Sequence, residues 1–591
     1  MPVDDGAVLS LAVPLGTFPW RYDATRQGRA GLLARLQHTL ERQLPHLHRH
    51  TVRGDSVAAD SMVRALVRYP VRTAVHFFTS DSDCDAIRAR LQTYPAPGAG
   101  ARPLSVTPAH TLIGRSEERH FDAWFDPTGS FPTGLSIRWT LSEHLYPVTA
   151  VVHGFSKHTM MHDYFLRIMT AGVAPCDSLV CTSRAAKAAV ANALDYVSQN
   201  FNREFGSRIK YEGRTDLIPL CVDTEVLSPG SKIEARARLG LPRQTLVVLY
   251  LGHMSAGKAD LMPLLSTWKL LVGDMPRRQL LLIVAGTAQP SYLAQLKQCA
   301  RGLGVAGQLR FVLDADDRTK VMLLRSADIF VSPSDSVQES FGLAPVEAMA
   351  CGVPQVVSDW DGYRDTVAHG QTGFLVPTRW AALDDLCGTG SLLGWEFEHL
   401  ALGQSIAVDF GTARQFLRIL IENEALRRQM GENSRIRAVS LYSMPAVVKQ
   451  YEALWSELCE IAQTLPQRER RASYLQPSYF RVFGHFASEQ LGESSVVRLT
   501  DFGRRVADER ELLPVNPQLS RTGVLDPTLL RSALTHLFCT GRDSAGITVG
   551  EIVCSLAPDH KASRATRHLM WLLKYGLIET GTAGPGTHRG D

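Results

Sequence analysis

The sequence predicts an α/β protein in which two Rossmann-like domains face a cleft and a small, mostly helical C-terminal domain follows. Two observations favour this class. Short, continuously apolar runs alternate with amphipathic segments in two successive series, as strands and helices do in parallel doubly wound sheets. The chain of 591 residues is also too long for one hydrophobic core, because a domain usually contains about 150 residues.

The first series gives an N-terminal Rossmann-like domain over residues 1–225. Its expected strands are short apolar runs, at 8–13, 73–78, 123–125, 148–152, 178–181 and 217–219. A loop rich in Pro and Gly interrupts the series at 94–103. Gly28 and Gly31 precede an amphipathic helix that we expect to begin near Leu32.

A second Rossmann-like domain is predicted over residues 226–445, where the strands are clearer because they are rich in β-branched residues. They are expected at 246–251, 280–285, 309–312, 329–332 and 355–358. Residues from about 380 to 406 match neither helix nor strand cleanly, so we interpret them as a surface insertion. Helices at about 410–440 and 446–465 are expected to close this domain.

The C-terminal part of the chain begins with a polar linker at 466–472. An accessory domain is expected over 473–580 and a flexible tail over 581–591. Residues 547–581 contain a helix, a turn, a second helix and a short strand, which together look like a winged helix. The second helix is basic, with Lys561, Arg564, Arg567, His568 and Lys574. Nucleic-acid contact is one interpretation, and a solvated helix in a protein-interaction or oligomerisation module is the favoured one.

Composition limits the class of protein. The hydrophobic fraction of 45% and the net charge of +4 are ordinary, so the whole-molecule balance does not indicate nucleic acid or an acidic membrane as a partner. Asp4 and Asp5 stand where a signal peptide would carry Lys or Arg, and no apolar run approaches a transmembrane length. Ten cysteines are scattered without metal-ligand spacing. We therefore expect a cytoplasmic protein with reduced thiols and no metal site.

The most informative stretch is residues 327–362. The expected strand at 329–332 is followed by a loop and then by a helix with Pro345 near its first turn, and Gly352 ends that helix. Ligands of parallel sheets bind at this edge, where strands end. The residues at the start of the helix present free backbone N–H groups that suit a phosphate, namely Ser340, Phe341, Gly342 and Leu343.

Two carboxylates flank the start of this helix. Glu339 lies in the loop before it and Glu347 lies within it, eight positions later. A carboxylate accepts two hydrogen bonds from neighbouring hydroxyl groups, so it suits a sugar or a ribose. In their context, ESFGLAPVEAMACGVP, the two residues resemble the E-x7-E motif of family-4 retaining glycosyltransferases, which have the two-domain GT-B fold. The resemblance implies that Glu339 contacts the transferred sugar and Glu347 the nucleotide ribose.

A second segment, LYLGHMSAGKAD at residues 249–260, resembles the first strand and loop of the family's donor domain. In that family a Gly-Arg pair, and a Lys five residues after the Arg, embrace the donor diphosphate. Gly252 and Lys258 match the pattern, whereas His253 stands where Arg is expected. Arg is a permanent bidentate clamp on phosphate, whereas His is a single-point donor that is charged only when its pKa is raised.

A third segment, VVHGFSKH at residues 151–158, resembles the strand of the first domain that ends in a His-Gly pair. The resemblance places His153 near the reacting sugar carbon, although a lone His is more often structural. CDSLVCTSRAAKAAV and HGQTGFLVP also fit the family, with Ser183 capping a helix and Gly373 in a turn. The resemblance covers about residues 140–460. It is weakest on the acceptor side, where a Gly-Gly loop is missing.

The resemblance implies a hexosyltransferase that moves a sugar from a nucleoside-diphosphate sugar with retention. The donor is a co-substrate, and no cofactor is expected. The catalytic residues are then His153, Lys258 and Glu339, and Lys258, His253 and the helix N-terminus stabilise the leaving diphosphate. No metal is needed for this arrangement. The Asp-x-Asp patterns at 81–83 and 359–361 mimic a metal motif of another fold, and we interpret both as turns.

The acceptor is unknown from the sequence, and a small molecule, a peptide or a protein would each fit. A second interpretation is a catalytically weak or inactive sugar-nucleotide-binding scaffold, whose C-terminal domain binds protein or nucleic acid. His253 and the appended domain favour it. A third, weaker interpretation is a nucleotide-sugar epimerase on the same fold, which would act without an acceptor.

Overall fold

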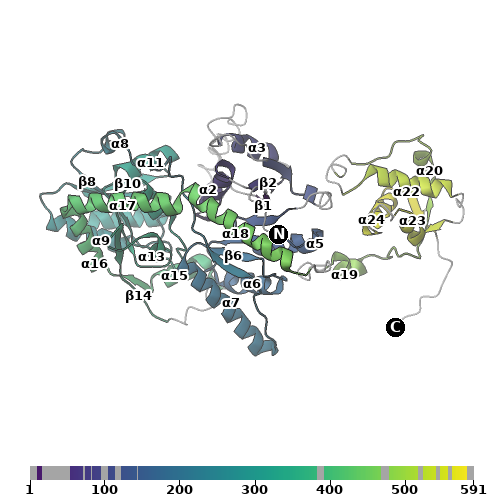
Figure 1. The fold of residues 1–591 in the computed structure, drawn as a ribbon, viewed down its shortest axis with the longest axis horizontal. Coiled ribbons are helices and arrows are strands. Elements are labelled where there is room, and N and C mark those ends of the chain that lie inside the picture. Colours follow the sequence, from purple (N-terminus) through teal and green to yellow (C-terminus); the bar gives the residue numbers. More distant parts are fainter. Residues whose placement is uncertain are drawn as a thin grey trace. The chain divides into compact units, whose positions relative to one another are not determined.

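A computed structural model describes most of the chain. The described residues are 9–15, 54–70, 73–80, 83–94, 104–112, 121–142, 144–382, 392–466, 478–516, 519, 524–540, 546–556 and 562–581. Gly28, Gly31, Leu32, Asp81 and Lys561 lie outside them, as do most of the predicted linker and tail. The chain divides into two compact units, Met1–Thr107 with Phe121–Arg471, and Pro108–His120 with Ala472–Asp591 (Figure 1).

The first unit begins with a seven-stranded sheet of order β3-β2-β1-β4-β5-β6-β7. Its strands are β1 (Leu9–Pro14), β2 (Thr73–Thr79), β3 (Leu104–Pro108), β4 (Ala123–Asp126), β5 (Val148–Val152), β6 (Ser178–Cys181) and β7 (Arg214–Leu217). All pairings from β2 to β7 are parallel. The helices between them are α2 (Gly54–Arg68), α3 (Cys84–Gln92), α5 (Phe131–Leu141), α6 (His158–Thr170) and α7 (Arg184–Phe205).

Two strands of this sheet differ from the prediction. The sequence analysis missed β3 and placed the last strand at 217–219 instead of at β7. Both are outer strands with polar residues, LSVTP and RTDL, and neither is buried throughout. An edge strand has only one neighbour and need not be apolar on both faces, so it gives no continuous apolar run.

A second parallel sheet follows in the same unit, with six strands in the order β10-β9-β8-β11-β12-β13. They are β8 (Leu246–Leu251), β9 (Leu280–Gly286), β10 (Leu309–Leu313), β11 (Ile329–Ser332), β12 (Gln355–Ser358) and β13 (Gly373–Val376). Gly373 begins β13 instead of forming a turn. Only glycine fits there, because a Cβ would lie 2.3 Å from the Gln355 carbonyl oxygen. The turn residue is Gly370, with φ +74°. Two Rossmann-like halves confirm the predicted fold class.

The helices of the second half connect and cover these strands. They are α8 (Lys232–Arg238), α9 (Met262–Asp274), α10 (Pro290–Gly302), α11 (Asp317–Ser326), α12 (Leu343–Ala350), α13 (Tyr363–Thr366), α16 (Phe410–Glu422) and α17 (Glu424–Tyr442). Strands β14 (Thr378–Trp380) and β15 (Ile406–Val408) form a small antiparallel pair. Helix α15 (Trp395–Gly403) lies between them in the sequence.

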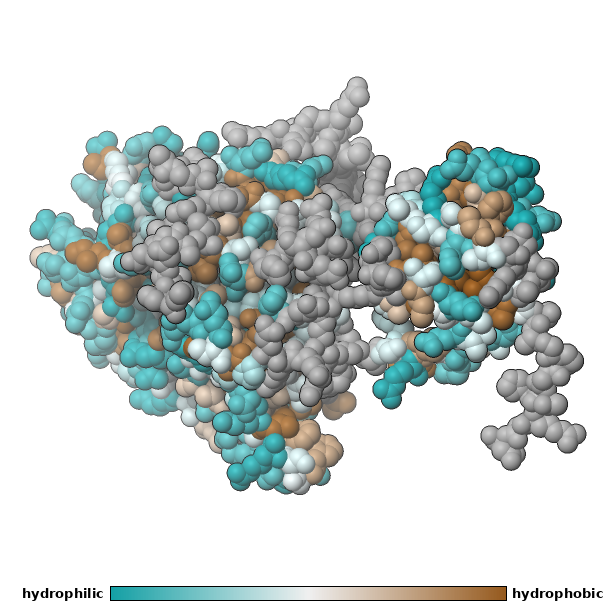
Figure 2. Space-filling view, turned by 45° about the vertical axis from the view of Figure 1, so that its right-hand side comes forward, coloured by the Kyte–Doolittle hydropathy of each residue, from teal (hydrophilic) through white to brown (hydrophobic). Residues whose placement is uncertain are grey.

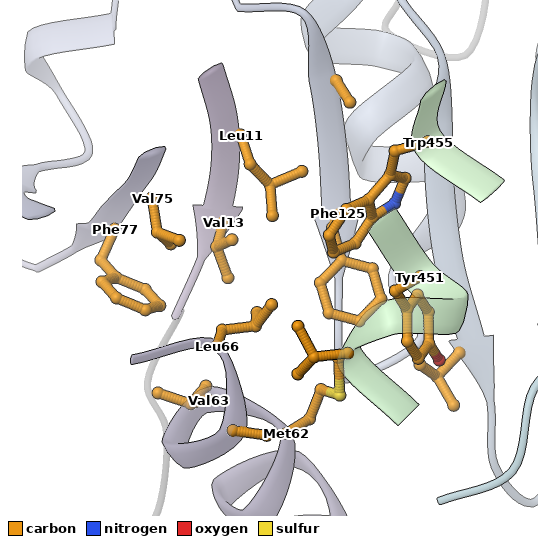
Figure 3. Close-up of a cluster of buried hydrophobic side chains, with 14 of the residues drawn as sticks. Leu11, Val13, Met62, Val63, Leu66, Val75, Phe77, Phe125, Tyr451 and Trp455 are labelled. Atoms are coloured by element: carbon orange, nitrogen blue, oxygen red, sulfur yellow. The ribbon is translucent and has the colours of Figure 1, made fainter. Parts of the chain in front are cut away.

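The helix after α17 returns to the first sheet. Helix α18 (Met444–Thr464) was expected to close the second domain, but its apolar face lies in the core of the first one. Figure 3 shows Tyr451 and Trp455 against Phe125 of β4, with ring centroids 5.1 and 5.3 Å away. Trp455 also donates a hydrogen bond to Thr149 of β5. The spacing of its apolar residues predicts a buried face but not the domain against which that face packs.

The second unit has its own core and a three-stranded antiparallel sheet. The strands are β16 (Val496–Leu499), β17 (Ile547–Thr548) and β18 (Ile578–Thr580), with β16 in the middle. The helices α20 (Asp501–Ala507), α22 (Pro527–Cys539), α23 (Val549–Leu556) and α24 (Ala562–Lys574) contribute to the core. A short helix, α19 (Tyr479–Phe483), and a 3-10 turn, η4 (Gly484–Phe486), precede them.

The basic helix predicted in this unit is α24, and one of its members is not a surface residue. His568 is fully buried. Its Nε2 accepts a hydrogen bond from the Asp526 N–H, and its Nδ1 lies 2.7 Å from the Arg564 carbonyl oxygen. Arg564 forms an ion pair with Asp526. The exposed cations of the described part of α24 are thus Arg567 and Lys574, a much weaker basic face than the sequence suggested.

Candidate functional site

Glu339 lies in the loop between β11 and α12, and the loop after β12 holds its backbone. The Glu339 N–H donates to Asp361 at 2.7 Å, and the Gly362 N–H donates to the Glu339 carbonyl at 3.1 Å. Only glycine fits at 362, because a Cβ there would lie 2.5 Å from the Phe341 backbone. Burial raises the pKa of Asp361 to about 6. Asp361, the second Asp of the Asp-x-Asp pattern at 359–361, thus holds the backbone of Glu339, the first glutamate of the predicted motif.

Lys258 and Glu339 come together from two different strand ends. Lys258 follows β8, in a turn where its N–H donates to the Ser255 carbonyl. Its Nζ lies 4.0 Å from the nearer carboxylate oxygen of Glu339. The Lys258 side chain is 52% exposed and that of Glu339 is 27% exposed, so both are open to a ligand. A cation and a carboxylate thus face one accessible space where two parallel strands end.

The N-terminus of α12 lies at the same edge. Its N-cap residue, Gly342, has φ +86° and provides no side-chain cap. A Cβ at Gly342 would lie 2.3 Å from the Tyr363 ring, so the position admits no larger residue. The first N–H groups of a helix have no partner within the helix, and they attract anions when no side chain caps them. Phe341, which precedes Gly342, is buried, while Leu343 is half-buried.

Glu347 points away from open solvent. It is 6% exposed and forms an ion pair with Lys320 of α11. The sequence analysis did not single out Lys320. A ribose at this carboxylate would therefore also meet the Lys320 ammonium group, which restricts the orientation of the Glu347 side chain.

His253 lies at the end of β8, where the backbones of two strands meet closely. The Gly252 N–H donates to the Ala285 carbonyl, and a Cβ on Gly286 would lie 1.9 Å from the Gly252 carbonyl oxygen. The His253 Nδ1 is 2.7 Å from the Thr287 hydroxyl. Burial lowers the pKa of His253, and the charge of Lys258 lowers it further. His253 is consequently neutral at pH 7 in the ligand-free protein.

His153 follows β5 in the first Rossmann-like domain. Its Nε2 lies 2.7 Å from the Pro127 carbonyl oxygen. A carbonyl only accepts hydrogen bonds, so Nε2 carries the proton of the neutral ring and donates it. This bond ties His153 to the end of β4 and fixes the orientation of the ring at the edge of the first sheet.

Direct hydrogen bonds join the two Rossmann-like domains beside these residues. The Gln338 Oε1 accepts from the N–H groups of Phe155 at 2.7 Å and Ser156 at 2.9 Å. The Thr182 hydroxyl, after β6, donates to the Ser340 carbonyl at 3.0 Å. Gln338 adjoins Glu339 and Phe155 is two residues after His153, so these contacts set the spacing between the predicted catalytic residues. The sequence analysis missed both Gln338 and Thr182.

Part of the chain that carries this site matches a known family model. Residues 231–386 match the family model described as Glycosyl transferases group 1. This group 1 segment contains Gly252, His253, Lys258, Glu339 and Glu347, while His153 lies before it.

Known proteins resemble parts of the chain. It is 34% identical over 198 residues to D-inositol 3-phosphate glycosyltransferase 2 of Catenulispora acidiphila, covering 32% of this chain and 45% of the relative. It is 36% identical over 154 residues to the phosphatidyl-myo-inositol mannosyltransferase of Mycolicibacterium smegmatis, covering 26% and 36%. The chain thus spans less than half of the length of these curated relatives.

One solved structure resembles a larger part of the chain. It is the crystal structure of Anabaena HepE in complex with UDP and glucose, with a TM-score of 0.48 and 15% sequence identity. The similarity covers 76% of this chain and all of that one.

The segment after the group 1 match contains a helix that the sequence analysis interpreted as a surface insertion. Helix α15 and the residue after it instead contact both the first domain and the Lys258 loop of the second. The Trp395 ring lies 4.3 Å from the Lys157 Nζ, and the His399 Nε2 lies 3.3 Å from the Ser156 hydroxyl, both in the first domain. Gln404, just after α15, donates to Asp260 in the Lys258 loop. Mixed polarity hid the helix, because its contacts are polar or aromatic instead of periodically apolar.

Asp335, a further carboxylate of the group 1 segment, anchors the Lys258 loop. It is 8% exposed and accepts a hydrogen bond from the Asp260 N–H at 3.1 Å. Burial raises the pKa of Asp335 to about 7. The bond joins the loop after β8 to the loop after β11. It therefore helps to set the distance between Lys258 and Glu339.

Two absences apply to the described residues alone. Among them, no group of three or more His, Cys, Asp or Glu side chains could hold a metal ion. Within the same part of the chain, no helix combines the length and the apolar character needed to cross a membrane.

Proposed function

We propose that this chain is a retaining glycosyltransferase that transfers a sugar from a nucleoside-diphosphate sugar to an acceptor. The observation that carries the proposal is the approach of the Lys258 Nζ to within 4.0 Å of Glu339, beside the uncapped N-terminus of α12. Cationic and anionic groups and free backbone N–H groups then meet in one accessible place. The group 1 match over residues 231–386 supports the same assignment.

Departure of the nucleoside diphosphate places negative charge on its phosphate oxygens in the transition state. Lys258 and the N–H groups at Gly342 and Leu343 are positioned to stabilise that charge, since they are held in place before the reaction. Glu339 accepts hydrogen bonds from hydroxyl groups of the transferred sugar. Glu347, paired with Lys320, holds the ribose. All of these groups come from the second Rossmann-like domain.

The first domain completes the site across the cleft. His153 donates a hydrogen bond from Nε2 to the Pro127 carbonyl, so Nδ1 is the acceptor nitrogen of the neutral ring. Gln338 fixes the loop that follows His153 relative to Glu339. We infer that His153 lines the sugar-binding space opposite Glu339. Retention at the anomeric carbon is inferred from the E-x7-E pattern.

A second candidate function is a sugar-nucleotide-binding scaffold with little turnover. The observation that favours it is a histidine at 253, whose Nδ1 lies 2.7 Å from the Thr287 hydroxyl and whose pKa is lowered by burial and by Lys258. A neutral imidazole provides one hydrogen bond, where an arginine would supply a charged, bidentate clamp. The diphosphate then depends on Lys258 and on the backbone N–H groups. This site would bind the donor and stabilise the leaving charge less.

Donor turnover separates the two candidates. The full chain is mixed with UDP-, GDP- and ADP-sugars, and released nucleoside diphosphate is measured. Transferase activity predicts slow release that Lys258→Ala and Glu339→Gln each abolish. Lys269→Ala, which removes an exposed lysine from α9, is the matched control and retains the activity. Binding of a donor without release would favour the scaffold, and failure to bind any nucleoside diphosphate would contradict both candidates.

The acceptor screen can begin with the relatives. Two of them are named for D-inositol 3-phosphate and phosphatidyl-myo-inositol, so inositol phosphates are reasonable first compounds to test. The anomeric configuration of any product, read by NMR, tests retention. An inverted product would contradict the retaining mechanism while leaving the transferase assignment intact.

A further inference from the structure

The start of the second unit presents a run of large hydrophobic side chains to water. In α19 (Figure 1) and η4, five such residues occur within eight positions. Their exposed fractions are 84% for Tyr479, 61% for Phe480, 43% for Val482, 47% for Phe483 and 74% for Phe486. Single exposed apolar residues are ordinary on a protein surface, where hydrophobic areas lie beside hydrophilic ones, as on the face in Figure 2. A contiguous exposed cluster indicates an interaction surface.

This aromatic segment, residues 478–486, is separate from the core of its unit. None of its residues belongs to the hydrophobic core that the described helices and strands of the second unit form. Its ring contacts are internal, with centroids 6.3 Å apart for Tyr479 and Phe483 and 5.5 Å apart for Phe483 and Phe486. All of its residues except Gly484 are exposed. At about 100° per residue, the hydrophobic side chains of α19 lie on one side of the helix and Arg481 lies on the other.

The charge of the segment has one sign. Arg481 and His485 are exposed, and the sequence contains no Asp or Glu from 478 to 488. Aromatic side chains combined with basic ones are typical of segments that lie in the interfacial layer of a membrane. The basic side chains are attracted to anionic lipid headgroups, and the rings bury apolar surface among the acyl chains.

We propose that the aromatic segment inserts into the interfacial layer of a membrane that contains anionic lipids, as a peripheral anchor of this chain. An interfacial helix turns its apolar side toward the acyl chains and its basic side toward the headgroups, which fits the two sides of α19. The combination of exposed aromatic side chains with basic ones, and with no acidic residue nearby in the sequence, favours anionic lipid over a protein groove or a second copy of the chain. Arg481 and His485 lie at the level of the headgroups.

Vesicle sedimentation tests the proposal with the full chain. Vesicles of phosphatidylcholine with phosphatidylglycerol are compared with vesicles of phosphatidylcholine alone. We expect binding to the anionic vesicles that weakens with added salt, and at least about tenfold weaker binding in the triple variant Phe480→Ser, Phe483→Ser and Phe486→Ser. Arg481→Glu weakens binding to anionic vesicles and leaves the residual binding to neutral ones unchanged.

A matched control removes a similar amount of exposed apolar surface elsewhere. The triple variant Phe205→Ser, Ile436→Ser and Leu512→Ser changes residues that are 69%, 66% and 86% exposed and belong to no such run. It retains vesicle binding. The wild-type chain already contains nine tryptophans, so the emission of a Phe483→Trp variant minus that of the wild type adds a direct readout, because the fluorescence of the new ring shifts to the blue when it enters the lipid.

Several outcomes would overturn the proposal. One is a wild-type chain that does not sediment with anionic vesicles, and another is a control variant that loses as much binding as the aromatic one. A Phe483→Trp variant whose emission does not shift also overturns it. A concentration-dependent dimer that the aromatic triple variant abolishes would assign the segment to self-association instead.

Discussion

Gln338 offers a sharp test of how the two Rossmann-like domains are positioned. Its side-chain oxygen accepts hydrogen bonds from the N–H groups of Phe155 and Ser156, across the cleft. Replacing Gln338 with Met keeps the length of the side chain and removes the strong acceptor. Gln338→Glu keeps the acceptor and makes the two bonds charge-assisted. The pair of variants therefore separates hydrogen bonding from the shape of the side chain.

The size of the effect follows from the number of bonds. A neutral hydrogen bond contributes about 0.5–1.5 kcal/mol net, so two bonds contribute about 1–3 kcal/mol to the arrangement in which the domains are joined. Because about 1.4 kcal/mol corresponds to a factor of ten, the loss reduces the equilibrium constant for the joined arrangement by roughly fivefold to hundredfold. Opening allows water to reach the freed N–H groups, which keeps the loss within this range instead of adding a desolvation penalty.

Single-turnover release of nucleoside diphosphate is the assay. We expect Gln338→Met to slow release by the factor above, with little change in thermal stability, because the two sheets and their cores are untouched. Gln338→Glu should retain most of the rate. Equal loss in both variants would show that side-chain shape or charge at 338 matters instead of the two bonds. An unchanged rate in Gln338→Met would refute the positioning role outright.

Two further predictions concern histidines. A bound diphosphate raises the pKa of His253 from its lowered value, so binding takes up a proton and the affinity for nucleoside diphosphates increases as the pH falls through about 6.5. Calorimetry in two buffers of different ionisation enthalpy measures this uptake, and His253→Asn should abolish it; an affinity independent of pH would contradict the contact. Burial lowers the pKa of His568, so the unfolded state takes up a proton first, and the second unit loses stability as the pH falls below about 6.5. Urea unfolding at two pH values checks this. If the change in the free energy of unfolding between the two pH values were the same in His568→Asn as in the wild type, the prediction would be contradicted.

The strands that position the site could be predicted well from the sequence, whereas several supporting contacts could not. The run at 329–332 and the glycine and proline positions that follow it placed Glu339 and α12 at the correct edge. β7 was misplaced because an outer strand carries polar residues. α18 shows a different limit, since amphipathic spacing reveals a buried face without naming its partner.

Gln338 and Thr182 could not be predicted because they bind backbone atoms. Gln338 bonds to two backbone N–H groups and Thr182 bonds to a backbone carbonyl. A backbone partner has the same chemistry whatever side chain it carries, so no residue type at 155, 156 or 340 signals the contact in the sequence. Lys320 meets a side chain, Glu347, but the two residues lie on different helices, and no fixed spacing connects them.

The same contacts indicate which parts of the site would separate if the two domains moved apart. Separating the two domains at this point breaks the two bonds to Gln338 and the bond from Thr182 to the Ser340 carbonyl, and all three join the loop that carries Glu339 to the first domain. Helix α15 adds the contacts of Trp395 with Lys157 and of His399 with Ser156, next to the same N–H groups. Such a movement would take Glu339 away from His153. Lys258 would stay with Glu339, because Asp335 ties the Lys258 loop to the loop that carries Glu339. A donor bound by Lys258 and α12 would consequently remain on the second domain during opening, and the first domain would part from the transferred sugar.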